Sequence, residues 1–596
     1  MEAKTLVEMF QEVVKKHGQK TSLMQKVEGE FKGFSYAEFG ERVKNFALGL
    51  ASLGITHGDR IAMISENRPE WAISDFGILS LGATNVPIYP TITPQQIEYI
   101  LKDSGSRLII VSKPDLLEKI LQIKDNLPAL QKVIYMDESE TKKDYMLKFD
   151  ELYEMGKKFD KDHAGYFENA VKKVMPDDLC GIIYTSGTTG APKGVMLTHN
   201  NLLSNVMAAK QVIRVDETDT LLSFLPLCHS FERMAGHFLA ISAGATVAYA
   251  ESTETVADNL GEVKPTLMTS VPRLFEKIYG RVIENANAGS PVKKKIFWWA
   301  VNTGEKYVDA KFAGKIPGGL NFKYKLATKL VFSKLHQRVG GNLRFFVSGG
   351  APLPKEIAEF FYKAGILILE GYGLTETSPV ITVNREEKFK FGSVGPAVPG
   401  VEVKIADDGE VLTRGPHVMK GYYKNPEATA ESIDKDGWLH TGDIGILDEE
   451  GMLYITDRKK NIIVTSGGKN VTPATIENLL VTSPFIEQTM VIGDKRNYLT
   501  ALIVPSFAAL KKFADENGIS YSDVKELLTN EKIYQAVDTD VQNLTKDLAR
   551  FEQIKKFTLM PKEFTIEDGE LTPTLKVKRK VVSEKYADVI NKMYVE

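Results

Sequence analysis

The chain has 596 residues, and its length, composition and charge already exclude several classes of protein. A chain of this length exceeds one ordinary hydrophobic core, so we expect at least two domains. Its hydrophobic content of 43% and charged content of 26% are typical of a globular protein rather than a disordered or fibrous one. The formal net charge of -3 provides no overall field for phosphate backbones, which argues against a general nucleic-acid-binding protein.

The cysteine content and the N-terminal segment favour a cytoplasmic protein. Cys180 and Cys228 are the two cysteines, too few for a disulfide framework or a cluster of soft metal ligands. Residues 1–20 have apolar positions at helical spacing interleaved with charges, which predicts a surface helix rather than a secretion signal. The longest apolar stretch, 234–250, is shorter than the roughly 20 residues that a membrane span needs, and it predicts a buried helix and strand. Peripheral contact with the inner face of a membrane stays open.

Short apolar runs alternate with helical patterns along the first half of the chain. Apolar runs begin at Arg60, Arg107, Lys132 and Thr266, and each is typical of a strand buried in a parallel sheet. Amphipathic helical patterns occur at 69–82 and 93–105. This order predicts an α/β fold.

The second half of the chain changes character twice. Residues 285–335 predict a helical insertion, and we interpret its cluster of three lysines and three aromatic residues at 293–299 as a solvated face beside a core contact, in preference to a membrane-docking patch. After Gly392, short strands and Asp-Gly turns predict a small antiparallel β unit at about 392–457. We therefore expect a large N-terminal α/β domain of several subdomains over 1–457 and a small, mobile C-terminal α+β domain over 458–596, joined by a hinge.

The strongest chemical motif is CGIIYTSGTTGAPKGVMLTHNN at 180–201, in which an apolar strand leads into a loop of glycines and small hydroxyl residues. Such a loop lets backbone N–H and side-chain O–H groups surround phosphate oxygens, while a lysine adds positive charge. The spacing differs from the P-loop pattern, which disfavours a P-loop ATPase or kinase. The predicted phosphate-holding residues are Thr185, Ser186, Gly187, Thr188, Thr189, Gly190 and Lys193.

The string YTSGTTGAPKG resembles the signature of the adenylate-forming superfamily, which includes acyl-CoA synthetases, peptide-synthetase adenylation domains and luciferases. The other motifs of that superfamily follow in the same order, each too short to be specific alone. In GYGLTETSP (371–379), the resemblance implies that Tyr372 lies against adenine, that Thr375 approaches the α-phosphate, and that Glu376 holds Mg²⁺ together with Thr185. Glycine-rich segments are expected to line the adenine pocket through Gly349, Gly350, Ala351, Gly371 and Gly373.

Residues 436–470 resemble the corresponding segment of fatty acyl-CoA synthetases in particular. The resemblance implies that Asp443 accepts hydrogen bonds from the ribose hydroxyls, that Arg458 holds the ribose and phosphate side, and that Lys460 is the hinge. It also implies that a turn faces the pantetheine thiol after domain rotation, although a plain hairpin turn is the alternative. That turn contains Ser466, Gly467, Gly468 and Lys469.

Two further segments supply the remaining catalytic candidates. DGELTPTLKVKRK (568–580) resembles the final loop of the family, and spacing to Arg579 aligns Lys576 with the catalytic lysine. Leu575 replaces the usual glycine, which leaves Lys578 as an alternative. LPLCHSFERMAGH (225–237) resembles a segment that borders the acyl site, so His229 is either an acyl-site residue or a satisfied core histidine.

Taken together, the motifs imply an ATP-dependent ligase that adenylates a fatty acid and transfers the acyl group to coenzyme A, with ATP, Mg²⁺, a fatty acid and CoA as its small-molecule partners and no nucleic acid. Two alternatives stay open: a fatty acyl-AMP ligase or an adenylating enzyme that delivers to a carrier-protein thiol, and a catalytically inactive nucleotide-binding relative. Whether the chain forms a homodimer also stays open.

Overall fold

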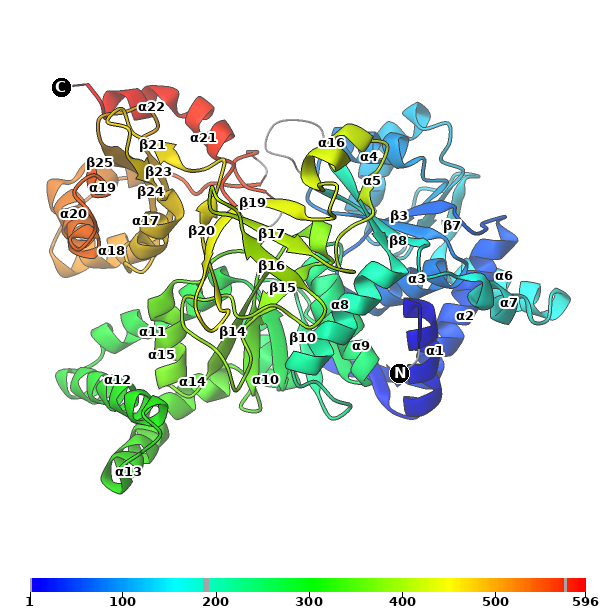
Figure 1. The fold of residues 1–596 in the computed structure, drawn as a ribbon, viewed down its shortest axis with the longest axis horizontal. Coiled ribbons are helices and arrows are strands. Elements are labelled where there is room, and N and C mark those ends of the chain that lie inside the picture. Colours follow the sequence, from blue (N-terminus) through cyan, green and yellow to red (C-terminus); the bar gives the residue numbers. More distant parts are fainter. Residues whose placement is uncertain (1–2, 186–191, 567, 573–575, 596) are drawn as a thin grey trace.

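The computed structural model describes residues 3–185, 192–566, 568–572 and 576–595. These residues form a mixed α/β structure in which two large sheets lie side by side, with a smaller C-terminal body beyond them (Figure 1). The predicted α/β fold is confirmed.

The first sheet has eight strands in the order β15-β14-β13-β12-β10-β11-β1-β2. Its interior strands pair in parallel, while β15 and β2 pair antiparallel at the two edges. The strands are β1 (Thr21–Val27), β2 (Glu30–Ser35), β10 (Thr220–Ser223), β11 (Thr246–Tyr249), β12 (Leu267–Ser270), β13 (Phe345–Ser348), β14 (Leu367–Gly373) and β15 (Val380–Val383).

The second sheet also has eight strands, in the order β18-β9-β8-β4-β3-β5-β6-β7. Strands β3 to β8 pair with one another in parallel. Strand β9 then returns antiparallel beside β8. The strands are β3 (Arg60–Ile64), β4 (Thr84–Ile88), β5 (Leu108–Val111), β6 (Lys132–Tyr135), β7 (Met146–Lys148), β8 (Leu179–Thr185), β9 (Lys193–Thr198) and β18 (Gly421–Tyr422).

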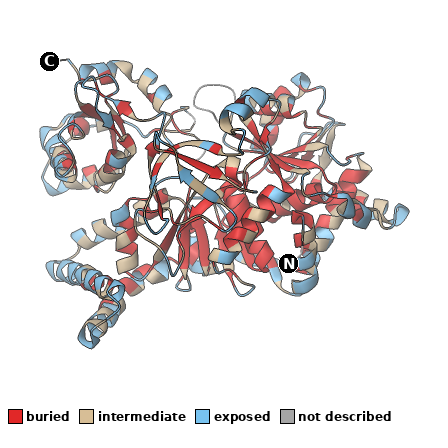
Figure 2. Ribbon diagram, in the orientation of Figure 1, coloured by how far each residue is buried: buried red, intermediate tan, exposed pale blue. Residues whose placement is uncertain are grey.

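Alternate residues of these strands belong to different hydrophobic clusters, because successive side chains point to opposite faces of a sheet. On β12, Leu267 belongs to the largest cluster, which residues of both sheets share, and Met268 belongs to a second cluster on the outer face of the first sheet. On β3, Ile61 and Ile64 divide in the same way between the shared cluster and one on the outer face of the second sheet. The buried interior thus extends through both sheets (Figure 2).

The helices cover these faces in three groups. The shared cluster contains residues of α1 (Leu6–His17), α2 (Tyr36–Ser52), α3 (Pro69–Ser80), α6 (Phe149–Asp162), α7 (Tyr166–Lys173), α8 (His199–Val212), the π-helix η2 (Glu232–Phe238) and α9 (Leu239–Ala243). The outer face of the second sheet packs against α4 (Pro94–Ser104) and α5 (Pro114–Ile123). The outer face of the first sheet packs against α10 (Val256–Val263), α11 (Pro272–Ala288), α12 (Pro291–Phe312), α14 (Ser333–Arg338) and α15 (Lys355–Lys363).

The predicted antiparallel β unit is also confirmed. It is a four-stranded sheet of β16 (Glu402–Ile405), β17 (Glu410–Arg414), β19 (Leu439–Leu447) and β20 (Leu453–Arg458). Helix α16 (Pro426–Ser432) lies between β18 and β19 in the chain.

The C-terminal body has its own hydrophobic clusters. Its strands are β21 (Ile463–Val464), β22 (Asn470–Val471), β23 (Ile486–Ile492), β24 (Leu499–Pro505) and β25 (Ile554–Leu559), and its helices are α17 (Pro473–Leu480), α18 (Phe507–Glu516), α19 (Val524–Thr529), α20 (Glu531–Thr545), α21 (Arg579–Lys585) and α22 (Ala587–Lys592). Helix α17 begins at Pro473, and Thr472 in the N-cap position makes no side-chain cap hydrogen bond. The boundary at 457/458 stays a prediction.

The expected helical insertion is present as the last part of α11, then α12, α13 (Gly318–Ala327), the π-helical turn η3 (Thr328–Phe332) and α14. Helices α12 and α13 project away from the two sheets, at the lower left of Figure 1. Across the described ranges, none of the helices combines the length and apolar character that crossing a membrane would require.

Candidate active site

The candidate residues gather where strands of both sheets end. Strand β8 ends at Thr185, β13 ends beside Gly349, and β14 ends at Gly373. In open α/β sheets, ligands bind at the carboxyl ends of the strands. The sequence-predicted residues of three distant segments therefore lie along one edge of the structure.

Strands β8 and β9 hold the two ends of the predicted phosphate loop. Thr185 and Lys193 are direct partners in this antiparallel pair, so the seven residues between them connect the two strands. The Lys193 ammonium lies 5.0 Å from the centre of the Tyr422 ring. The remaining predicted loop residues lie outside the described residues: Ser186, Gly187, Thr188, Thr189 and Gly190.

Glu376 lies in the short helix η4 (Thr375–Thr377), directly after β14. The Tyr422 hydroxyl donates a hydrogen bond of 2.9 Å to its Oε1. Among the residues that the structure describes, no lysine, arginine or histidine forms an ion pair with this carboxylate. A partly buried carboxylate that lacks a described cationic partner has the oxygen chemistry that Mg²⁺ prefers.

Asp443 and Arg458 are the predicted ribose residues, and Tyr372, predicted to lie against adenine, contacts Asp443. Asp443 and Arg458 are partners across β19 and β20, and their side chains form an ion pair with Nε to Oδ1 at 3.1 Å. The Tyr372 hydroxyl donates a 2.7 Å hydrogen bond to Asp443 Oδ2. Burial, followed by the charge of Asp443, raises the pKa of Tyr372 well above its usual value, so this phenol stays a hydrogen-bond donor at neutral pH. Asp443 is thereby fixed in place while Arg458 keeps about half of its side chain exposed, at 48%.

The glycines of the predicted adenine pocket leave little room for side chains. A Cβ on Gly349 would lie 3.1 Å from the Phe231 ring, and one on Gly373 would lie 1.7 Å from the Pro379 carbonyl oxygen. Gly350 has φ of +80°, which favours glycine. Gly371 approaches Val383 on β15, and Ala351 follows as an exposed residue. A side chain at position 373 would therefore require the backbone to move, whereas one at position 349 would require only a small shift of the Phe231 ring.

Lys576 lies at the closed end of the C-terminal loop. Leu571 and Val577 form a β-bridge, the Thr572 N–H donates to the Lys576 carbonyl at 2.8 Å, and the Lys576 N–H donates to Thr572 Oγ1 at 3.0 Å. Two residues after this β-bridge, the Arg579 guanidinium forms an ion pair of 2.5 Å with Glu477 of α17. Leu575, whose effect was in question, lies outside the described residues.

The pKa of Lys576 reports its surroundings, because the charges of Arg458 and Asp443 both act on its ammonium group. The pKa of Lys576 is lowered to about 8, first by desolvation and then by the charge of Arg458, with the charge of Asp443 opposing both. Because the Lys576 residue as a whole is exposed, the desolvation reflects crowding around its ammonium group rather than complete enclosure of the side chain. Lys576 therefore lies within electrostatic range of Arg458 and Asp443, and its catalytic role stays a prediction.

His229 lies within electrostatic range of Lys576. Burial, followed by the nearby charge of Lys576, lowers its pKa to about 4, so its imidazole is neutral at physiological pH. Its Nδ1 accepts a 3.3 Å hydrogen bond from the Phe231 N–H, which leaves Nε2 as the protonated nitrogen. Its ring lies 6.4 Å from that of Tyr89. A neutral histidine within range of Lys576 favours the acyl-site interpretation over a plain core residue.

The predicted hinge and CoA residues are exposed. Lys460 is exposed, directly after β20, next to Lys459, which pairs with Asp408 at 2.5 Å and Glu410 at 3.2 Å. The segment Ser466 to Lys469 forms an exposed hairpin turn between β21 and β22. Ser466 Oγ bonds Asn497 Oδ1 at 2.7 Å, and the Lys469 ammonium lies 5.9 Å from the Phe551 ring. In this arrangement, none of the four turn residues Ser466, Gly467, Gly468 and Lys469 is brought to Lys576 by a described contact.

Three residues of the site were not singled out in the sequence. Tyr422 contacts both Lys193 and Glu376, Ser230 Oγ lies 3.3 Å from Thr375 Oγ1, and Phe231 lies against Gly349. Ser230 and Phe231 directly follow His229 in the chain, so the segment that indicated His229 could have included them. Tyr422 lies in GYY, a string with no chemical feature that indicates a site.

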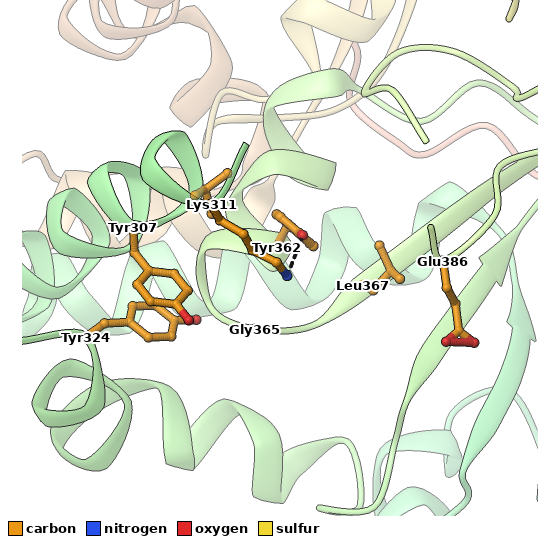
Figure 3. A pocket seen from close by; sticks show the side chains of 8 residues that line it. Tyr307, Lys311, Tyr324, Tyr362, Gly365, Leu367 and Glu386 are labelled. Carbon is orange, nitrogen blue, oxygen red and sulfur yellow. Dashed lines mark hydrogen bonds between the residues drawn. The ribbon is translucent and has the colours of Figure 1, made fainter. Parts of the chain in front are cut away.

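A separate cavity of about 260 Å³ lies at the opposite end of β14 (Figure 3). It is lined by Tyr307, Val308, Lys311, Tyr324, Tyr362, Gly365, Leu367 and Glu386. Leu367 is the first residue of β14 whereas Gly373 is the last. At about 3.3 Å per residue, the two ends are roughly 20 Å apart, so this cavity is not part of the candidate active site.

Comparison with known proteins bears directly on these motifs. Residues 10–423 match the family model described as AMP-binding enzyme, and residues 460–596 match that of the AMP-binding enzyme C-terminal domain. A long-chain-fatty-acid–CoA ligase of Mycobacterium bovis is 39% identical over 572 residues, covering 95% of this chain and 93% of the relative. A peroxisomal long chain acyl-CoA synthetase of Arabidopsis thaliana is 32% identical over 595 residues, covering 95% and 82%.

Solved structures agree on the fold. The adenylation domain of a carboxylate reductase from Mycobacterium chelonae superposes with a TM-score of 0.78 at 22% identity, covering 100% of this chain and 92% of that one. With both family models matched in order and relatives covered over nearly their whole length, the chain belongs to the AMP-binding enzymes, the adenylate-forming superfamily, with a large N-terminal AMP-binding domain and a small C-terminal domain.

Proposed function

We propose that the protein is a long-chain fatty acid–CoA ligase that forms AMP. The observation that carries this proposal is the proximity of Lys576 to the ion pair of Asp443 and Arg458, although more than 100 residues separate Lys576 from the other two. That convergence is what the adenylation of a carboxylic acid requires. The near full-length similarity to a fatty-acid–CoA ligase supports the choice of substrate and acceptor.

The first half-reaction joins the acid to AMP. A carboxylate oxygen attacks the α-phosphorus of ATP, the bond to the β-phosphate oxygen breaks, and pyrophosphate leaves. Lys576 neutralises charge shared between the carboxylate and the α-phosphate, and Lys193 with the β8–β9 connection holds the polyphosphate. Asp443 orients the ribose, and Arg458 lies on its phosphate side.

Glu376 and Thr185 would hold Mg²⁺, which when bound neutralises charge on the phosphate oxygens. The Tyr422 hydroxyl bonded to Glu376 Oε1 keeps the carboxylate turned toward β8 and β9. The neutral His229 offers its Nε2–H to an oxygen of the acyl group rather than a second positive charge.

The second half-reaction transfers the acyl group to CoA. The thiolate attacks the acyl carbon, the bond to the AMP oxygen breaks, and AMP leaves. Rotation about Lys460 would withdraw Lys576 and bring the turn Ser466 to Lys469 toward the cleft. The exposed position of that turn in the present arrangement supports a role in a second orientation. We also propose a cytoplasmic location, because both thiols are free rather than joined in a disulfide.

The test measures AMP, pyrophosphate and acyl-CoA with saturated acids from acetate to stearate, with and without CoA. We expect equal AMP and acyl-CoA for the longer acids and little turnover for acetate. Formation of ADP would refute the proposal. Acyl-AMP that accumulates without thioester in the presence of CoA would favour delivery to a carrier protein, and absence of pyrophosphate release with every acid would favour an inactive relative.

A further inference from the structure

The helical insertion concentrates the exposed apolar side chains of the molecule. Of the 17 large hydrophobic residues that are exposed in the described part of the chain, eight fall between 292 and 330, a segment we call the arm. They are Val292, Ile296, Trp298, Trp299, Phe312, Phe322, Leu326 and Leu330. Soluble surfaces scatter such residues singly, so a concentration of this kind indicates an interaction surface.

The exposed residues follow helical spacing on both helices of the arm. On α12, Val292, Ile296 and Trp299 recur at i, i+4 and i+7. Continuing from α13 into η3, Phe322, Leu326 and Leu330 recur at i, i+4 and i+8, with Phe322 70% exposed. Residues at these intervals lie on one face of a helix, so each helix presents an apolar stripe that no described element covers.

Basic residues flank these stripes. Between Ser290 and Leu335 the chain has ten lysines and two acidic residues, whereas the whole chain has a net charge of -3. Lys293, Lys294 and Lys295 adjoin the first stripe, and a second set adjoins the other. That second set is Lys323, Lys325 and Lys329. The arm is therefore strongly positive on a slightly negative protein.

The base of the arm holds its two helices in a fixed relation. The rings of Tyr307 on α12 and Tyr324 on α13 are stacked at 3.9 Å with an interplanar angle of 7° (Figure 3). The Tyr324 hydroxyl donates to the Lys363 carbonyl at 3.2 Å, which ties the pair to the end of α15. The arm thus presents its stripes without having to fold on contact.

We propose that the arm docks the protein onto the surface of an anionic phospholipid membrane. Apolar stripes flanked by lysine are the composition of helices that lie in the plane of the interface, with aromatic and leucine side chains among the acyl chains and lysine ammonium groups at the headgroups. The surplus of lysine selects anionic headgroups by charge complementarity. The 42% and 36% exposure of Trp298 and Trp299 is the reason that we propose membrane contact in preference to the solvated face expected from the sequence.

The inference stands apart from the proposed activity, because it concerns a surface on the side of β14 away from the candidate active site. It also differs from a membrane span, since the arm's helices are exposed and rich in lysine. A second copy of the chain is the competing occupant, and it would be recognised by a change in mass.

The first experiment measures co-sedimentation with vesicles of phosphatidylcholine, with and without phosphatidylglycerol. We expect binding to the mixed vesicles that weakens as salt rises. Changing Lys293, Lys294 and Lys295 together to Gln should weaken it about tenfold or more, because each lysine near an anionic surface contributes. The matched control changes three exposed lysines at the far end of the molecule, Lys158, Lys161 and Lys172, and should bind as the unaltered protein does.

The second experiment tests insertion of the apolar stripes. Brominated acyl chains should quench tryptophan fluorescence on binding, and the variant Trp298→Phe with Trp299→Phe should lose that quenching, since Trp71 is buried and Trp438 lies beside the four-stranded sheet. Phe322→Ser with Leu326→Ser should weaken binding without changing the mass in solution.

Equal binding by the Lys293–Lys295 variant and its control would overturn the proposal, as would equal binding to neutral and anionic vesicles. A dimer in solution that the Phe322→Ser, Leu326→Ser variant converts to a monomer, without vesicle binding by either protein, would assign the stripes to a second copy instead. Neither experiment measures catalytic turnover. The membrane proposal can therefore be tested even if the protein proves not to have the proposed ligase activity.

Discussion

Arg273 of α11 and Glu487 of β23 join the large N-terminal domain to the C-terminal domain. The Arg273 guanidinium donates to the Glu487 carbonyl at 2.7 Å and to its Oε1 at 2.6 Å, and both side chains are about three-quarters enclosed. The same arrangement keeps Lys576 within electrostatic range of Arg458 and Asp443, so this contact stabilises the orientation that we propose for adenylation.

Arg273→Ala should therefore slow adenylation by about fivefold, since a partly enclosed ion pair contributes about 1 kcal/mol to the balance between two orientations. Pyrophosphate release in a single turnover measures the first step, and thioester formation from preformed acyl-AMP measures the second, which should be unchanged or faster. Lys512→Ala is the matched control, because Lys512 pairs with Glu284 across the same interface but more exposed. Equal slowing of both steps by Arg273→Ala would contradict this role.

Lys576→Ala should lower the rate of acyl-adenylate formation by about a hundredfold or more. Loss of one charged contact to a transition state has an effect of this order. Thioester formation from preformed acyl-AMP should keep an appreciable rate, because Lys576 withdraws before that step. Lys578→Ala provides the control and should retain both steps, since Lys578 lies at the start of α21 with its N–H bonded to the Glu570 carbonyl at 2.7 Å. The opposite pattern would assign the catalytic role to Lys578.

The pH dependence of adenylation should follow the charge of Lys576. Its lowered pKa means that the ammonium is present below about pH 8 and is lost as the pH rises through that value. We expect kcat/KM to fall above about pH 8, whereas kcat falls at higher pH because bound polyphosphate favours the charged form. His229, with its pKa lowered to about 4, should add no titration between pH 5 and 8.

Lys576→Arg is the comparison for this profile, because an arginine stays charged throughout and should remove the fall in kcat/KM whatever its overall rate. Persistence of the same fall in Lys576→Arg would show that another group titrates.

Glu376→Gln should raise the Mg²⁺ concentration for half-maximal pyrophosphate release by about tenfold, because an amide oxygen is a weaker ligand for this cation than a carboxylate. Tyr422→Phe is the control, since it removes only the 2.9 Å hydrogen bond to Glu376 Oε1 and leaves the charge in place. A metal titration of initial rates distinguishes them. An unchanged metal requirement in Glu376→Gln would exclude this carboxylate as a ligand.

Much of the scaffold could be predicted because buried parallel strands are continuous apolar runs. The runs that begin at Arg60 and Lys132 are β3 and β6, and the helical pattern from Pro69 is α3. Such local patterns say nothing about which strands become neighbours, so the joining of β18 to β9, far apart in the chain, could not be predicted.

The same limit applies to the site. Asp443 and Arg458 could be chosen because both lie in the segment 436–470 that carries the resemblance, and the structure pairs them directly across one hairpin. Tyr422 could not be predicted from the sequence. Its contact with Glu376 depends on the pairing of β18 with β9, which brings Gly421 opposite Met196. The roles given to the site residues, and those of Ser186 to Gly190 above all, stay predictions.

The two cysteines have a consequence for the safety of the proposed chemistry. An acyl-adenylate acylates any thiolate that it meets, and Cys228 directly precedes His229 in the chain. Both Cys180 and Cys228 are buried, and burial raises the pKa of each thiol well above its usual value. The chain therefore holds no nucleophilic sulfur of its own with which to trap the activated acid, and self-acylation does not compete with the thiol that arrives from solution.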